Sequence, residues 1–359
     1  MRLAVIDLGT NSVRFDVHEI RPGNLIRQLH RGKLMVRLGQ GVFLEGRLDK
    51  DAIRRTVQAF TSFKRTAEEL QATKIVAFGT SALREAADSE RLLNTIRTRA
   101  GIDVRVISGQ EEARLIAQGI LNNERQPKGR FALLDIGGGS AEISVCQGRK
   151  IFYSDSFPLG TARLQQVFLK SSPPKQNLPG ELPATDQLRR YIKSVILPKT
   201  ISEGWPKVAQ MIGSSGTIRA LGRMLKKSGG SGKAIEIKEL RKLIKSMSSM
   251  TTTQLLGIPG MEAKRVDMIL AGAILLEECM DALGTKKVTT TDYSLRDGIL
   301  EEELHLYREH QGSHLALHLP DLYAKAARFG GSEAHIRQVV GLAGTLFSKL
   351  KNVHKLKPA

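Results

Sequence analysis

The sequence repeats one short pattern, and this repeat constrains the fold more than any other feature. Residues 7–12 read Asp-Leu-Gly-Thr-Asn-Ser, and residues 135–140, which lie 128 positions later, read Asp-Ile-Gly-Gly-Gly-Ser. Each copy follows an apolar run typical of a buried strand and precedes a second strand-like run. A duplicated strand–turn–strand unit predicts an α/β protein with two similar lobes that face each other across a cleft.

The periodicity of the remaining chain predicts helices and strands around this repeat. We expect an amphipathic helix over residues 51–70, a strand over 208–212, a long helix over 261–282 and two tail helices over 315–328 and 333–350. A polar break at residues 122–129 is the expected boundary between the lobes. The predicted domains are a first lobe over 1–124, a second lobe over 125–305 and a helical tail over 306–359.

The glycine-rich turns of the repeat have the chemistry of an anion site. Glycines allow backbone N–H groups to converge on one point, and the side chains of Asn11, Ser12 and Ser140 add further donors. A strand-terminal Asp could hold a hydrated Mg²⁺ ion, which prefers oxygen ligands. A third cluster, Gly-Ser-Ser-Gly-Thr at residues 213–217, offers a helix N-terminus to an anion. A single such turn is more often an ordinary hairpin, but two matched copies and this junction together favour a phosphate site.

A pair of acids, Glu111 and Glu112, opens a further expected helix after Ser108. Acids in a first helical turn commonly interact with the helix dipole or cap the helix, and this alternative stays open. The functional interpretation is a general base that is aimed at a water molecule beside a bound phosphate.

The overall charge indicates a polyanionic partner. The chain carries 55 Lys and Arg against 36 Asp and Glu, a net charge of +19, and residues 187–245 alone carry fourteen basic and three acidic residues. The alternative for this stretch is a solvated helix face. Its few aromatic residues disfavour nucleic acid. Two cysteines, the early acidic residue in the N-terminal segment and the lack of a long apolar run favour a cytoplasmic protein without a membrane partner.

Seven segments, taken together and in order, resemble the motifs of the Ppx/GppA phosphatases, which are exopolyphosphatases and guanosine pentaphosphate phosphohydrolases. The segments are residues 7–12, 79–86, 108–113, 135–142, 160–164, 213–217 and 291–298. The resemblance covers roughly residues 1–305. It implies the two-lobed fold of the actin-like ATPases, which is ribonuclease H-like, and therefore agrees with the duplication.

The resemblance also implies roles for individual residues. Glu112 matches the catalytic base, and Asp7, Asp135 and Glu142 match acids that hold a divalent metal, expected to be Mg²⁺, or order the water. The residues that would hold phosphate oxygens are Asn11, Ser12, Arg84, Gly138, Gly139, Ser140, Ser215, Gly216 and Thr217. From the basic stretch we predict that Arg189, Arg190 and Lys193 follow a long polyphosphate chain out of the cleft.

The tail departs from the long members of the family, which continue into a helical HD-type domain. This sequence has no His-Asp dipeptide, and His314 and His318 lack a third metal ligand. It therefore resembles the short members or a truncated chain, with a homodimer left open.

The function predicted first is exopolyphosphatase activity. The alternatives are guanosine pentaphosphate hydrolysis, an actin-like kinase and a non-catalytic polyphosphate sensor.

Overall fold

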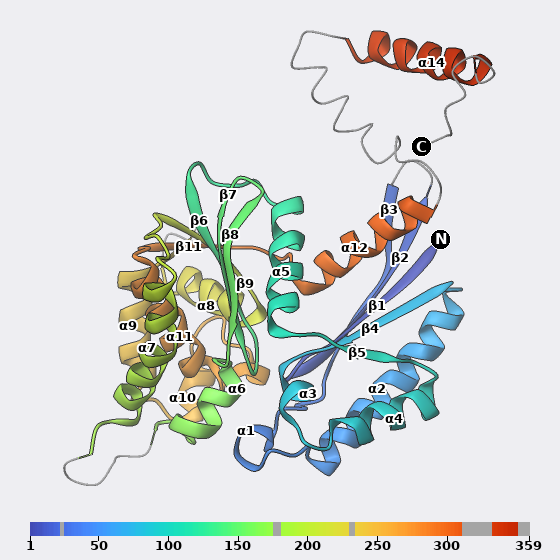
Figure 1. Cartoon of the computed structure of the whole chain (residues 1–359). Helices are drawn as coiled ribbons and strands as arrows, with labels where there is room; N and C mark the ends of the chain where they lie inside the picture. Colours follow the sequence, from blue (N-terminus) through green and yellow to red (C-terminus); the bar gives the residue numbers. More distant parts are fainter. Residues whose placement is uncertain (22–24, 175–180, 230–233, 311–331, 351–359) are drawn as a thin grey trace. The chain divides into compact units, whose positions relative to one another are not determined.

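Two β-sheets form the framework of residues Met1–Ile299 (Figure 1). The computed structural model describes residues 1–21, 25–174, 181–229, 234–310 and 332–350. The first sheet has the strand order β3-β2-β1-β4-β5, and the second has the order β10-β11-β9-β6-β7-β8. The strands are β1 Arg2–Leu8, β2 Ser12–Arg21, β3 Leu25–Met35, β4 Lys74–Gly79, β5 Val104–Val106, β6 Arg130–Ile136, β7 Ala141–Gln147, β8 Lys150–Phe157, β9 Gln210–Ser214, β10 Ile235–Glu236 and β11 Lys287–Thr290.

The pairing of the strands confirms the duplication. In the first sheet β1 is antiparallel to β2 and parallel to β4, and in the second sheet β6 is antiparallel to β7 and parallel to β9. The order β3-β2-β1-β4-β5 thus recurs as β8-β7-β6-β9-β11, with β10 added at the edge. Asp7 lies opposite Arg14 in the first hairpin, and Asp135 lies opposite Glu142 in the second. The two repeats therefore occupy equivalent places in a two-lobed α/β fold.

Helices cover both sheets. They are α1 Val42–Glu45, α2 Lys50–Glu69, α3 Ser81–Glu85, α4 Ser89–Ala100, α5 Gly109–Asn123, α6 Thr161–Leu164, α7 Ala184–Ser202, α8 Gly216–Lys227, α9 Ile237–Met247, α10 Thr252–Leu256, α11 Ile269–Leu283 and α12 Leu295–His310, with short π- and 3₁₀-turns at Gln165–Leu169 and Ala263–Arg265. The predicted helix over 51–70 is confirmed as α2, which Asp49 begins by accepting a hydrogen bond from the Ala52 N–H at 2.9 Å. The buried residues Phe60 and Phe63 of α2 then join the core of the first lobe.

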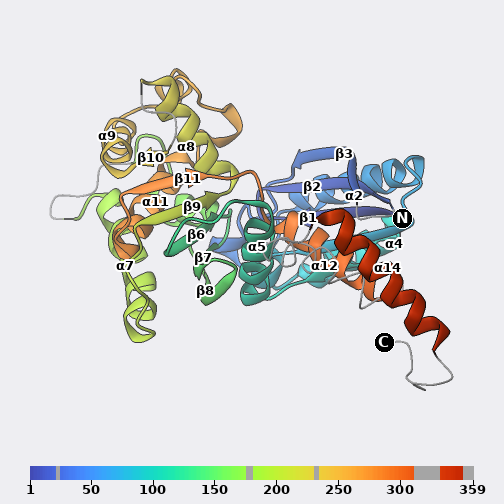
Figure 2. The same cartoon turned by 90° about the horizontal axis from the view of Figure 1, so that it is seen from above.

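The core of the second lobe is built around α11, which packs between α7 and α9 (Figure 2). Most of this helix is buried, including its polar residues Glu277 and Glu278. Its glycine, Gly272, lies against two threonine methyl groups: a Cβ atom there would lie 3.0 Å from Cγ2 of Thr161 and still closer to Cγ2 of Thr217. The helix therefore contacts both segments directly.

The predicted ends of one helix and one strand are wrong. The long helix expected over 261–282 begins only at Ile269, because Glu262 holds Lys264 and Arg265 in a tight turn before it. The strand expected over 208–212 is shifted to Gln210–Ser214, where it pairs with β6 in a register that places Ser214 opposite Asp135.

The second unit, Leu300–Ala359, is described only in part. Its helix α14, Glu333–Lys349, confirms the prediction for residues 333–350, and Ser332 begins it by accepting a hydrogen bond from the His335 N–H. The helix predicted over 315–328 lies outside the described residues. Among the described helices, none combines the length and the apolar character that crossing a membrane requires.

Candidate active site

The two repeated turns meet at one cavity of about 100 Å³ between the two sheets. The first turn, residues 9–12, and the second, residues 137–140, approach so closely that a Cβ atom on Gly138 would lie 2.8 Å from the Asn11 amide nitrogen and from Cβ of Thr10. The predicted phosphate residues that line the cavity are Asn11, Ser12, Gly138, Gly139, Ser140, Ser215, Gly216 and Thr217. The structure therefore brings together eight of the nine residues predicted to hold phosphate.

The third glycine-rich junction is backbone-strained at the point where it enters the cavity. Ser215 has a φ of 94°, a region that residues with a side chain rarely adopt, and its hydroxyl accepts hydrogen bonds from the N–H groups of Thr217 and Ile218 at 3.2 Å. A Cβ atom on Gly216 would overlap the guanidinium of Arg265, so any side chain there would displace that guanidinium. The start of α8 therefore lies directly beside an arginine that lines the cavity.

Glu112 occupies the first turn of α5 and lines the same cavity. Ser108 caps the N-terminus of this helix, because its hydroxyl accepts a hydrogen bond of 3.1 Å from the Glu111 N–H. Glu112, the next residue, is thereby held in the first helical turn. Burial raises the pKa of Glu112 to about 7, while the nearby Arg84 opposes the rise. A carboxylate with such a pKa can accept a proton near neutral pH, as a general base must.

Arg84 is the one predicted phosphate residue that does not line the cavity. Its Nη1 atom donates to Oε2 of Glu112 at 2.8 Å and to the carbonyl oxygen of Ile107 at 2.9 Å. The arginine therefore holds the candidate base in place, and a role in phosphate binding stays a prediction.

Three further acids surround Glu112. Asp7 and Asp135 line the cavity, whereas Glu142 lies buried behind it and accepts a hydrogen bond from the Ser156 hydroxyl at 2.7 Å. Burial raises the pKa values of Asp135 and Glu142, and the charge of Glu112 raises that of Glu142 further. These desolvated carboxylates are hard oxygen donors with excess negative charge, a donor set that suits Mg²⁺.

The described residues contain no group of three or more His, Cys, Asp or Glu side chains that could together hold a metal ion. Asp7, Asp135 and Glu142 are therefore not a complete ligand set. Their role as metal ligands stays a prediction; in phosphoryl-transfer sites, Mg²⁺ is commonly shared among one or two carboxylates, water molecules and the substrate phosphates.

A group of cations also lies at the cavity, and of these the sequence suggested only Arg14, two residues beyond Ser12, as a further clamp on phosphate, with an exposed strand arginine as the alternative. The members of the group are Arg14, Lys33, Lys264 and Arg265, with Arg219 close enough to influence them. Lys33 is exposed at the surface, but desolvation by the surrounding protein and these neighbouring cations lower its pKa to about 7. One signal was available: on adjacent antiparallel strands Arg14 lies opposite Lys33, so a correct register would have paired them.

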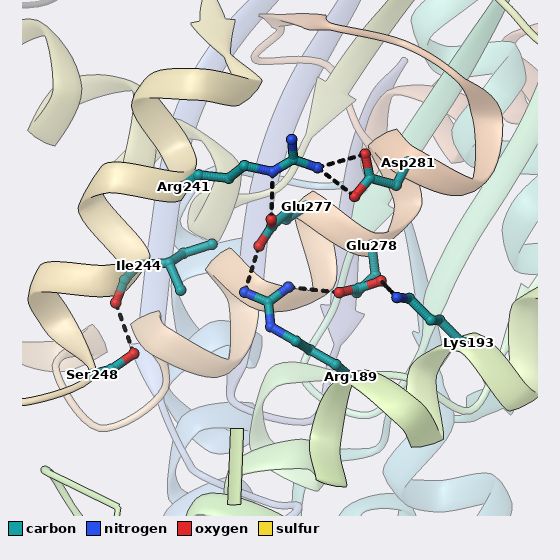
Figure 3. Close-up of polar contacts among 8 residues, drawn as sticks. All are labelled: Arg189, Lys193, Arg241, Ile244, Ser248, Glu277, Glu278 and Asp281. Carbon is teal, nitrogen blue, oxygen red and sulfur yellow. Dashed lines mark hydrogen bonds and ion pairs between the residues drawn. The ribbon is translucent and has the colours of Figure 1, made fainter. Parts of the chain in front are cut away.

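The predicted polyphosphate track lies on α7, where two of its three cations are already paired. Arg189 contacts Glu278 at 2.6 Å and Glu277 at 2.7 Å, and Lys193 contacts Glu278 at 3.5 Å (Figure 3). Arg241 of α9 also contacts Glu277. None of Arg189, Arg190 and Lys193 lines the cavity as described. The track therefore stays a prediction, and it depends mainly on the exposed Arg190.

Comparison with known proteins assigns this chain to a family. The sequence profile of the Ppx/GppA phosphatase family matches residues 17–307. The chain belongs to the Ppx/GppA phosphatase family. Exopolyphosphatase 1 of Mycobacterium leprae is 28% identical over 312 residues, which cover 85% of this chain and 90% of that protein. Exopolyphosphatase 1 of Mycobacterium tuberculosis is likewise 28% identical, over 85% of this chain and 88% of the relative.

Solved structures of Ppx/GppA proteins agree with this assignment. An exopolyphosphatase from Cytophaga hutchinsonii has a TM-score of 0.76 and 26% identity, covering 85% of this chain and 98% of that one. A Ppx/GppA family member from Aquifex aeolicus has a TM-score of 0.68 and 24% identity, covering 86% and 98% of the two chains. The first likeness supports the family, and the second shows the fold, which is α/β and two-lobed.

Proposed function

We propose that this Ppx/GppA protein hydrolyses the terminal phosphoric anhydride bond of inorganic polyphosphate, with Glu112 as the general base. The observation that carries the proposal is the position of Glu112, a carboxyl group with a pKa of about 7 at a cavity formed by two facing glycine-rich turns. The exopolyphosphatases among the similar proteins support polyphosphate as the substrate.

Different residues of the cavity would remove the proton, bind the phosphate and neutralise its charge in such a reaction. Glu112 would remove a proton from the attacking water, while Arg84 holds its carboxylate through a 2.8 Å hydrogen bond. The N–H and hydroxyl groups of the turns would hold the phosphoryl oxygens. Because phosphoryl transfer passes through a loose transition state, positioning and charge neutralisation contribute more than covalent chemistry. Arg14, Lys33 and Arg265 would supply that neutralising charge at the substrate.

Asp7 and Asp135 are the residues that would hold Mg²⁺, because both line the cavity and Asp135 is desolvated. The ion would neutralise charge on the phosphate oxygens. Glu142, which lies behind the cavity, would order the catalytic water or the second turn.

The test is orthophosphate release from polyphosphates of several lengths, guanosine pentaphosphate and ATP, with and without Mg²⁺. We expect Glu112→Gln to reduce kcat by roughly 10²–10⁴-fold, the usual contribution of a general base. The matched control is Glu111→Gln in the same helical turn, because Glu111 pairs instead with Arg105 at 2.8 Å. Equal activity of wild type and Glu112→Gln would refute the mechanism. Hydrolysis of ATP alone would instead favour the kinase-like alternative.

A neighbouring cavity keeps guanosine pentaphosphate as a second candidate substrate. This cavity of about 160 Å³ shares Asn11 and Met268 with the first, and its other lining residues are Arg37, Gln40, Ala162, Gln165, Gln166 and Asp267. Asp267 pairs with Arg37 at 3.7 Å, and Oε1 of Gln166 is buried without a hydrogen-bond partner. Because the charges of Asp267 and Arg37 balance and the other polar lining residues are amides, the lining suits a nucleobase better than a phosphate.

Gln166→Leu separates the two substrates. If the second cavity holds a base, this change should lower kcat/KM for guanosine pentaphosphate and leave tripolyphosphate hydrolysis unchanged.

The predicted polyphosphate track is tested by Arg190→Glu, which should reduce the hydrolysis of long polyphosphate chains more than that of short ones. An equal loss at every chain length would return this residue to a solvated helix face.

A further inference from the structure

The second phosphate turn rests on the beginning of α6. The N–H of Thr161 donates to the carbonyl oxygen of Gly137 at 3.0 Å, and the N–H of Ala162 donates to that of Gly138 at 2.8 Å. The third carbonyl, that of Gly139, accepts a hydrogen bond of 2.8 Å from the side chain Nε of Arg163. Three consecutive carbonyl groups of the turn are therefore held on the side that faces α6.

These three bonds determine where the next three N–H groups point. In a planar trans peptide the carbonyl group and the following N–H point in opposite directions. Fixing the carbonyls of residues 137–139 toward α6 therefore directs the N–H groups of Gly138, Gly139 and Ser140 away from it. All three residues line the cavity, and within the described chain no acceptor is assigned to these N–H groups. Together they form a nest for an anion.

Arg163 holds the Gly139 carbonyl through its side chain, whereas the Thr161 hydroxyl adds a longer bond of 3.4 Å to the Gly137 carbonyl, and Arg163 also reaches the first lobe. Its Nη2 atom pairs with Oε1 of Glu85 at the end of α3, and its guanidinium lies 4.2 Å from the centre of the Phe43 ring. The Ser81 hydroxyl donates to the same Glu85 oxygen at 3.1 Å. Only 13% of the Arg163 side chain is exposed. One arginine thus joins the phosphate turn of the second lobe to α3 of the first.

The space around the turn requires this close approach. A Cβ atom on Gly139 would lie 2.7 Å from Cζ of Phe43 and would overlap the Ser81 hydroxyl. A Cβ atom on Gly160 would likewise overlap the Gly138 backbone. Since the turn is packed between α6 and the first lobe, the orientation of its last peptide depends on contacts from both sides.

We propose that Arg163 is a positioning residue that aligns the Ser140 N–H with the reacting phosphate, and that Glu85 holds it in place from the opposite lobe. The pair then links the approach of the two lobes to the completion of the phosphate nest. The inference rests on the proposed function, because it takes this nest to hold the phosphate that is cleaved. Arg163 acts through the backbone and is itself no catalytic residue.

The experiment uses the full chain with Mg²⁺ and compares Arg163→Lys, Glu85→Gln and the double variant. Lysine keeps the positive charge but cannot bond Gly139 and Glu85 simultaneously in the planar geometry of a guanidinium. Removing one oxyanion donor commonly reduces kcat by 10²–10³-fold, so misaligning one of three should reduce it roughly 10–100-fold. The change should fall on kcat for tripolyphosphate more than on KM.

Two further readouts separate positioning from a merely structural role. We expect Arg163→Lys to weaken the binding of inorganic phosphate, measured by calorimetry, with little change in Tm. We also expect the double variant to be no worse than Arg163→Lys alone, because the two residues act as one unit. The matched control is Arg97→Lys, at an exposed arginine that likewise pairs through its side chain, with Asp103.

Wild-type kcat and phosphate affinity in Arg163→Lys, or additive losses in the double variant, would overturn the inference. Should Arg163→Lys fail to fold, Glu85→Gln carries the test, because Glu85 is 38% exposed and its replacement keeps the shape of the side chain. If the wild type releases no phosphate from any substrate, the proposed function fails by itself. The phosphate-binding comparison then still decides whether Arg163 aligns the nest.

Discussion

Replacing Glu112 by Gln should stabilise the folded protein although it strongly reduces turnover. The carboxyl group is buried, and its pKa in the folded state is raised from 4.5 to about 7. Glutamine keeps an oxygen that can accept the 2.8 Å hydrogen bond from Arg84 but never acquires a negative charge. The variant therefore avoids ionising a group in a desolvated site.

The size of this effect depends on pH. Between pH 4.5 and 7 the folded wild type binds a proton at Glu112 that the unfolded chain releases, so its free energy of unfolding decreases as the pH rises. One pKa unit corresponds to about 1.4 kcal/mol, and the interval therefore amounts to roughly 3 kcal/mol. Below pH 4.5 this contribution is fully present, and above about pH 7 it is lost. Glu112→Gln lacks the decrease, so its advantage should grow across this window and then remain constant.

The assay is urea denaturation of wild type and Glu112→Gln from pH 4.5 to 8.5 in EDTA, which keeps the acids free of metal. Glu142 titrates together with Glu112, so the curves describe the pair. A difference in free energy of unfolding that does not change with pH would refute the reasoning. So would a variant that loses stability relative to wild type as the pH rises.

Three other changes test neighbouring parts of the molecule. Lys33→Met should raise KM for tripolyphosphate roughly tenfold below pH 7, since a charged contact with the substrate is lost. Because the pKa of Lys33 is lowered to about 7, the KM of the wild type should rise above that pH. A wild-type KM that does not change with pH would contradict this role. Asp16→Asn should lower the free energy of unfolding by about 3 kcal/mol in urea denaturation, because it removes the buried negative charge that lies 2.5 Å from the Arg296 guanidinium. A loss under 1 kcal/mol would show that the ion pair is solvated. Gly139→Ala should lower phosphate release and inorganic phosphate affinity together, since its Cβ would overlap the Ser81 hydroxyl, and unchanged kinetics would show that the turn can shift.

The sequence predicted those parts of the site that depend on local backbone pattern. The two repeated turns and the junction before α8 are fixed by glycine and hydroxyl residues between strands, and the duplicated strand order places them at equivalent sheet positions. The local pattern indicated only a pair of acids, Glu111 and Glu112, at the start of a helix, and the family resemblance singled out Glu112. The local pattern and the family resemblance together therefore identified most of the residues that line the cavity turns.

The rest depended on contacts between distant segments. Arg265 was placed inside a long helix, and nothing local showed that Glu262 would hold it in a turn facing the cavity. Arg189 was predicted to be free to bind polyphosphate. Its partners, Glu277 and Glu278, lie almost ninety positions later on α11, so the local sequence does not show that its charge is paired. Arg84 was similarly expected at phosphate, whereas the fold brings it to Glu112. A net charge can be counted from the sequence, but its pairing is decided by packing.

Gly272, which lies in the first turn of α11, has a consequence for how the cleft could change during evolution. Glycine in a helix is about 1 kcal/mol less favourable than alanine, yet Gly272 is the point where the methyl groups of Thr161 and Thr217 approach the helix backbone. Thr161 belongs to the segment beneath the second turn, and Thr217 belongs to the junction before α8. The backbone at Gly272 thus contacts two residues that line the same cavity, Thr161 and Thr217, from one point. A single added methyl group at this position would move both residues at once, so their separation can be retuned in one step but neither residue can be adjusted there alone.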